Sequence, residues 1–106
     1  MGEKDNQEQR LFPEVKTYLN ITWADPDTDA RVRFWIQSGI AYLDKKRGAP
    51  ADYMQPSLSK TLLFEYARYM RDSALDVFEN NYRSMILSMQ HERAVSVIVE
   101  KTVSEE

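Results

Sequence analysis

The chain has no cysteine, only three glycines and one histidine among its 106 residues. Without cysteine it forms no disulfide, thiolate zinc site, iron–sulfur cluster or cysteine nucleophile. The three scattered glycines do not make a phosphate-binding loop. No apolar run is long enough to cross a bilayer, and the polar first ten residues are unlike a secretion signal. We therefore expect a protein made in the cytoplasm, with no membrane association, no cofactor and no metal.

The remaining candidates for chemistry are few. The lone histidine, His91, has no second metal ligand at helical spacing. Asp25, Asp27 and Asp29 alternate as calcium ligands do, but the glycine and the bidentate glutamate of a calcium loop are missing, so helix capping explains them better. We expect no enzymatic activity and no catalytic residue.

The charge balance argues against a protein that grips nucleic acid. The formal net charge is −3, whereas proteins that bind duplex DNA usually carry a basic stripe. Arginines near the tyrosines of residues 65–83 alternate with acids, and pairs such as Glu65–Arg68 and Glu79–Arg83 have the spacing of ion pairs on a helix surface. We interpret these residues as a solvated helix face.

What the chain does contain is enough apolar material for one small core. Hydrophobic residues make up 42% of the chain and aromatic residues 11%, and the length suits a single domain. The hydrophobic spacing predicts an all-α fold, a small bundle of about four helices over residues 13–19, 27–47, 57–72 and 74–90. Residues 1–10 are expected to be flexible, 11–90 to form the domain and 91–106 to form a tail.

Two helix boundaries carry clear signals. The second helix starts at Asp25, with Pro26 just inside it, or one step later at Asp27, and it stops before Gly48. In residues 57–90 the hydrophobic stripe changes phase, and Ser73 begins a sequence that resembles a capping box. We favour a break near residues 72–73; the alternative is one long helix that contacts different neighbours with each half.

The end of the chain changes its period. Val95, Val97 and Val99 alternate with other residues, and β-branched side chains dominate residues 94–100, as is typical of a strand. A lone strand needs a partner for its backbone groups, so this segment is predicted to add to another chain. The alternative is an extended tail in which the valines have no structural role.

Several large apolar residues lie off the predicted core faces or in the predicted loop. A chain of this size is marginally stable alone, and aromatic and methionine side chains often anchor protein interfaces. The candidate interface residues are Phe34, Tyr53, Met54, Phe64, Leu87, Val95, Val97 and Val99.

The order of these elements resembles the small head–tail connector, or adaptor, proteins of tailed bacteriophages. The resemblance rests on residues 15–19 (VKTYL) followed by the acidic turn 25–29, on residues 36–48, and on residues 62–82, which include ARYMRD and FENNY. It covers about residues 13–90, and its specificity lies in the order and spacing of the segments.

The resemblance implies a virion structural protein, made in the cytoplasm of a bacterial host, that assembles as a homo-oligomeric ring on the portal protein. Such a ring extends the DNA channel and docks a stopper or tail-completion protein, while DNA passes through without specific binding. A small helical regulator that binds DNA or a partner protein is the alternative from another functional class, and it would require a basic recognition helix.

Overall fold

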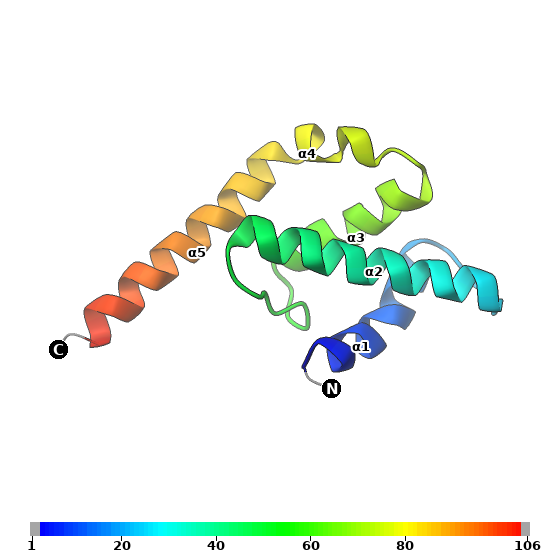
Figure 1. Cartoon of the computed structure of the whole chain (residues 1–106), viewed down its shortest axis with the longest axis horizontal. Helices are drawn as coiled ribbons and strands as arrows, with labels where there is room; N and C mark the ends of the chain where they lie inside the picture. Colours follow the sequence, from blue (N-terminus) through cyan, green and yellow to red (C-terminus); the bar gives the residue numbers. More distant parts are fainter. Residues whose placement is uncertain (1–2, 105–106) are drawn as a thin grey trace.

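The computed structural model describes residues 3–104, and all regular structure in that range is helical. Five α-helices and one 3₁₀ turn follow each other along the chain (Figure 1): α1 (Glu3–Tyr18), α2 (Pro26–Arg47), α3 (Leu58–Arg71), η1 (Leu75–Val77), α4 (Phe78–Asn81) and α5 (Arg83–Ser104). The predicted all-α class is confirmed. The predicted count of four helices is short by one, because a brief α4 separates α3 from α5.

Local capping explains both ends of α2. The Asp25 carboxylate accepts hydrogen bonds from the backbone N–H and the hydroxyl of Thr28, both at 2.9 Å, and Pro26 follows at the first helical position. At the other end Gly48 takes the left-handed conformation, with φ of 86°, and its N–H donates to the Asp44 carbonyl at 2.9 Å. Of the two predicted start residues, Asp25 is therefore the cap.

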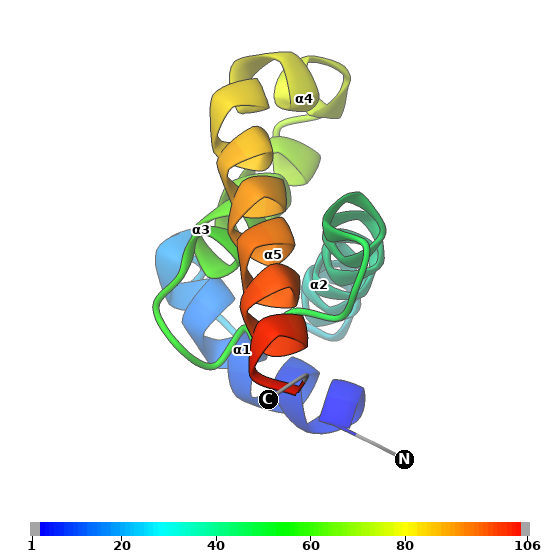
Figure 2. The same ribbon diagram turned by 90° about the vertical axis from the view of Figure 1, so that its left-hand side faces the viewer.

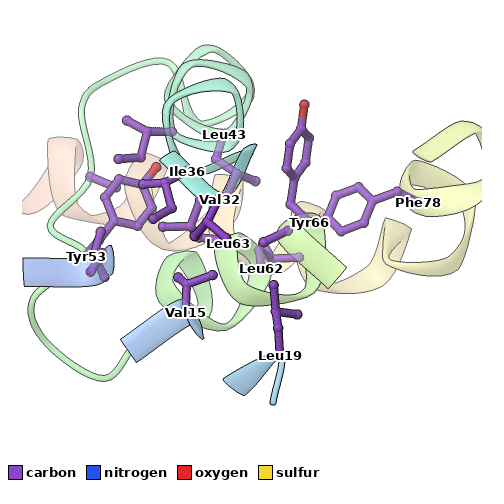
Figure 3. Close-up of a cluster of buried hydrophobic side chains, with 14 of the residues drawn as sticks. Val15, Leu19, Val32, Ile36, Leu43, Tyr53, Leu62, Leu63, Tyr66 and Phe78 are labelled. Atoms are coloured by element: carbon purple, nitrogen blue, oxygen red, sulfur yellow. The ribbon is translucent and has the colours of Figure 1, made fainter. Parts of the chain in front are cut away.

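The core lies where α1, α2 and α3 meet (Figure 3). Val15 of α1, Ile36 of α2 and Leu62 of α3 are fully buried in it. Gly39 allows close approach of α2 and α3, because a Cβ atom there would lie 2.6 Å from Leu63 Cδ1 and 3.0 Å from Tyr66 Cδ1. This three-helix contact is the frame that positions the rest of the chain.

An aromatic cluster attaches α4 to that frame. The ring of Phe78, which is almost completely buried, lies 5.5 Å from Tyr66, 5.5 Å from Tyr69 and 5.1 Å from Tyr82, measured between centroids. The contacts to Tyr66 and Tyr69 are edge-to-face, an arrangement that adds about 0.5–1.5 kcal/mol per pair beyond burial. Phe78 therefore fixes the place from which α5 departs.

The predicted break after α3 is confirmed, and one long helix over residues 57–90 is excluded. Helix α3 ends at Arg71, and Ser73 has a φ of 55°, which turns the chain. The predicted second half is corrected in two respects. Ser73 does not cap a helix, since η1 begins after Ala74 without a side-chain cap. The predicted single helix over residues 74–90 is replaced by η1, α4, a turn at Tyr82 and the start of α5. The reason is that this path brings Phe78 into the core.

The first helix starts earlier than predicted. Helix α1 begins at Glu3, so the predicted helix start at Pro13 is corrected, while residues 1–2 lie outside the described part of the chain. Leu11 is fully buried and lies four residues before Val15, so the apolar stripe continues past the proline. Pro13 has no backbone N–H and therefore cannot donate a hydrogen bond within α1. The burial of Leu11 stabilises the helix and offsets this loss.

The predicted strand or extended tail over residues 94–100 is wrong, because this segment is part of α5. A helix satisfies its own backbone hydrogen bonds, whereas a lone strand leaves them without partners. The helix propensity of valine and isoleucine is below that of alanine by less than about 0.7 kcal/mol per residue, so a missing strand partner outweighs it. The last predicted tail residues, 105–106, lie outside the described range.

Candidate interaction surface

Helix α5 is attached to the core by its first half only (Figures 1 and 2). Ile86 and Met89 are buried, and the Gln90 side chain donates a hydrogen bond to the Lys46 carbonyl at the end of α2, at 2.8 Å. Over residues 94–101 no side chain is buried. Figure 1 shows the second half of α5 projecting beyond the other helices, and in Figure 2 the same half of α5 lies in front of them.

The projecting half is rich in apolar side chains. Val95 is 45% exposed and Val99 is 55% exposed. At about 100° per residue these two valines share one side of α5, while the half-buried Val97 points to nearly the opposite side. Leu87, which is 57% exposed, lies earlier on the outer surface of the same helix. A helix with apolar residues on more than one side is usually buried, so this half of α5 is suited to bind another chain.

A buried carboxylate fixes the direction in which α5 leaves the core. Glu65 of α3 is 7% exposed and accepts hydrogen bonds from the hydroxyls of Tyr18 and Tyr82 and from the Arg68 guanidinium, whose Nε lies 3.2 Å from Oε1. Tyr82 lies in the turn that precedes α5, and Tyr18 ends α1. One side chain therefore joins α1, α3 and the base of α5.

The electrostatics of this cluster keep it charged and hydrogen-bonded. Burial raises the pKa of Glu65, but the hydrogen bonds from Arg68, Tyr18 and Tyr82 and the charge of Arg68 outweigh burial and lower the pKa to about 2. Burial and the hydrogen bond to Glu65 raise the pKa of Tyr82 to about 12. The predicted Glu65–Arg68 ion pair is present, but its carboxylate is not on a solvated face. No local pattern reveals the tyrosine partners, which come from 47 and 17 residues away.

A second apolar surface lies along α1 and α3. Two adjoining hollows, of about 440 and 280 Å³, share the side chains of Tyr18 and Phe64, whose rings meet edge to face at 5.2 Å. Pro13, Glu14 and Thr17 complete the first hollow, and Pro56, Ser57, Lys60 and Thr61 complete the second. We call this surface the α1–α3 hollows. Phe64, predicted as an interface residue, is half-buried between them.

The other predicted interface residues have different surroundings. Phe34 is 58% exposed on the outer side of α2, as expected of a surface anchor. Met54 is half-buried, with its sulfur 3.9 Å from Arg10 Nη1. Tyr53 is fully buried, and its hydroxyl donates to Asp44 Oδ1 at 2.7 Å. The prediction of Tyr53 as an interface residue is therefore corrected: it closes the loop between α2 and α3 over the core.

The described side chains form no group that could hold a metal ion, defined as three or more converging His, Asp or Glu residues. Asp25 caps α2, Asp29 pairs with Lys16 at 2.9 Å, and His91 lies on an exposed part of α5. Within residues 3–104 there is also no helix long and apolar enough to span a membrane.

Comparison with known proteins finds no match to this chain. No family model, no curated protein and no solved structure matches it.

Proposed function

We propose that this chain is an assembly protein of the head–tail interface of a tailed bacteriophage, where it forms a homo-oligomeric ring on the portal, extends the DNA channel and docks a stopper or tail-completion protein. The single observation that carries the binding role is the projecting, apolar second half of α5. The phage setting and the virion location rest on the resemblance of residues 13–90 to connector proteins.

Two features support assembly over catalysis. The buried polar clusters have structural partners: Glu65 joins three segments, and Asp44 binds the hydroxyl of Tyr53. Exposed apolar residues, in contrast, include two groups on separate helices, with Phe34 on α2 and Val95 and Val99 on α5. Two such surfaces allow one copy to contact more than one neighbour, as a ring and its docking partners require.

The proposal is tested by electron microscopy of the purified chain mixed with the portal protein encoded in the same genome. We expect an added ring of density on one face of the portal. A variant with Val95→Glu and Val99→Glu is expected to fold and to lose this density, because two charges replace exposed valines that a partner would bury.

A matched control carries Gln55→Glu and Asn80→Glu, which add the same charge at exposed positions outside both the Phe34 side of α2 and the second half of α5. The control is expected to form the ring as the natural chain does. If the natural chain adds no density to the portal at any ratio tested, the proposed function is wrong. A gel shift with duplex DNA at low and moderate salt tests the regulatory alternative, and we expect no shift at moderate salt.

A further inference from the structure

We propose that Glu65 couples the end of α1 to the start of α5, so that turning the Tyr18 ring away from Glu65 loosens the direction of the projecting half of α5. We call the series of hydrogen bonds Tyr18–Glu65–Tyr82 the Glu65 relay. The inference goes beyond the proposed function, because it concerns how two parts of one copy influence each other and needs no partner to be tested.

The two tyrosines of the relay hold different oxygen atoms of one carboxylate. The Tyr18 hydroxyl donates to Oε2 of Glu65, and the Tyr82 hydroxyl donates to Oε1. The Arg68 Nε lies 3.2 Å from Oε1 and 3.3 Å from Oε2, so it is shared by both oxygens. Because Glu65 is only 7% exposed, little water can reach its oxygens to replace a lost donor. The orientation of the carboxylate therefore depends on both tyrosines.

The outer end of the relay is a side chain that lies at the surface. Tyr18 is 45% exposed, and its ring lines both α1–α3 hollows, edge to face with Phe64 at 5.2 Å. Leu19, the next residue, is buried, so the backbone is anchored here while the Tyr18 ring can change its rotamer. The hydrogen bond to Glu65, together with burial, raises the pKa of the Tyr18 hydroxyl, so this group stays protonated and able to donate.

The inner end of the relay is the residue from which α5 starts. The Tyr82 carbonyl accepts a hydrogen bond from the Ile86 N–H at 2.9 Å, so its backbone belongs to the first turn of α5 while its hydroxyl binds Glu65. Ring contacts to Phe78 at 5.1 Å and to Tyr69 at 5.6 Å hold the Tyr82 side chain against the core and limit it to small shifts. A change at the carboxylate thus reaches the first turn of α5.

The projecting half of α5 enlarges such a shift. The helix is also attached through the Gln90 side chain, which donates to the Lys46 carbonyl at 2.8 Å. At 1.5 Å per residue, the stretch from Tyr82 to Gln90 is about 12 Å long and the stretch from Gln90 to Ser104 is about 21 Å long. If α5 pivots at Gln90, a shift of about 1 Å at Tyr82 moves the far end by roughly 2 Å. The relay therefore connects the α1–α3 hollows with the apolar half of α5.

Spin labels measure the direction of α5 within one copy. The chain has no cysteine, so Ala41→Cys on α2 and Glu100→Cys on α5 provide two labelling sites, both exposed. The labelled chain is diluted in an excess of unlabelled chain, and electron–electron double resonance gives the distribution of distances between the two labels. We expect a narrow distribution with Tyr18 in place and one broadened by roughly 2 Å in Tyr18→Phe, which keeps the ring but loses the hydroxyl.

Two further variants and a control show whether the effect passes through the relay. Tyr82→Phe is expected to broaden the distribution as Tyr18→Phe does. The double variant is expected to be no broader than the broader single variant, because both substitutions interrupt the same path. The matched control is Tyr53→Phe, which removes a tyrosine hydroxyl from the carboxylate of Asp44, outside the relay. It is expected to leave the distribution unchanged.

Amide hydrogen exchange supplies a second measurement. In Tyr18→Phe, exchange in residues 83–90 is expected to become roughly tenfold faster relative to exchange in residues 32–43 of α2. This ratio separates local loosening of α5 from a loss of stability of the whole chain, which would speed exchange in both helices. Tyr53→Phe is expected to leave the ratio unchanged, and circular dichroism verifies that every variant is folded.

Each outcome supports or refutes the coupling. An unchanged distance distribution in folded Tyr18→Phe refutes it, and so does a natural chain whose distribution is already as broad as that of the variant. A double variant broader than either single variant also refutes it, because the two tyrosines would then act separately. None of these results depends on ring formation. Absence of rings on the portal would refute the proposed function and leave the relay standing.

Discussion

Substitution of Glu65 by glutamine gives the sharpest test of how this fold is held together. The carboxylate is 7% exposed and accepts hydrogen bonds from Arg68, Tyr18 and Tyr82. Glutamine keeps the shape of the side chain but removes its charge. Its NH₂ group is a hydrogen-bond donor and would face partners that are donors themselves. Loss of one partner from a buried charged pair costs about 3–5 kcal/mol.

Solvent reduces this cost. Tyr18 is 45% exposed and the Arg68 side chain is 40% exposed. Water can therefore replace some of the hydrogen bonds that these two side chains lose when Glu65 is substituted. We therefore expect Glu65→Gln to lower the free energy of unfolding by about 2–3 kcal/mol, at or below the lower end of that range. For a chain of this size that corresponds to a fall of roughly 10–20 °C in the midpoint of thermal unfolding.

The pH dependence of the effect has a definite sign. Because the pKa of Glu65 is lowered from 4.5 to about 2, its stabilisation is complete above pH 4.5 and is lost as the pH falls through about 2. The difference between the natural chain and Glu65→Gln should be constant near neutral pH and shrink between pH 4.5 and 2. Urea unfolding followed by circular dichroism at a series of pH values measures it.

The control is Glu14→Gln, which breaks the ion pair with Lys60 at 2.9 Å. The Glu14 side chain is 46% exposed, and such surface pairs contribute about 0–1 kcal/mol. The reasoning about Glu65 is refuted if its glutamine variant unfolds within about 0.5 kcal/mol of the natural chain at pH 7, an interval that covers ordinary surface substitutions. It is also refuted if the difference at pH 7 persists unchanged at pH 2.

Three further predictions concern the packing and the role of α5. Gly39→Ala is expected to lower the free energy of unfolding, measured by urea titration, by about 1–3 kcal/mol, because the new Cβ would lie 2.6 Å from Leu63 Cδ1 in the core. This clash outweighs the better helix propensity of alanine. A variant more stable than the natural chain would contradict the prediction. Tyr53→Phe removes the 2.7 Å hydrogen bond to Asp44 and is expected to lower the free energy of unfolding by about 1–2 kcal/mol. Hydrogen exchange should become faster in residues 48–57 and stay unchanged in α1. An equal loss of protection in both segments would mean that the bond does not act locally. A chain that ends at residue 93 is expected to keep its midpoint of thermal unfolding within about 4 °C of that of the full chain, because none of the side chains 94–101 is buried. The same truncation is expected to abolish ring formation. A larger fall in the midpoint would show that residues 94–101 belong to the core.

The parts of the fold that could be predicted from sequence are those encoded by neighbouring residues. Asp25 and Pro26 start α2, and Gly48 ends it, because capping depends on side chains within a few positions of the helix end. The break after Arg71 was visible as a change in hydrophobic phase. These signals are local, and the structure confirms them.

The wrong predictions concern residues whose structure depends on contacts with parts of the chain that are distant in the sequence. The valines of residues 94–100 have strand propensity, but a strand needs a partner that the chain does not supply, so α5 continues. Tyr53 lies in a loop with proline on both sides, yet the loop folds back and buries it against Asp44. Phe34 and Leu87, which the helical spacing placed off the core faces, are exposed; Val95 and Val99 are exposed as well, but on a helix and not on the predicted strand. The α1–α3 hollows were missed because they form between helices that are separate in the sequence.

The separation of α5 into an anchored half and a projecting half has a consequence for the order of events in assembly. A helix of fewer than about 12–15 residues is only marginally stable in water, and the projecting residues have no buried side chain to support them. In a lone copy their amide hydrogens will therefore exchange with solvent much faster than those around Met89. In the proposed ring, contact with a neighbouring copy would have to order the helix end as it binds, which would make each single contact weak and reversible. Misplaced copies could then leave the proposed ring, and closure of the last contact would make the assembly lasting.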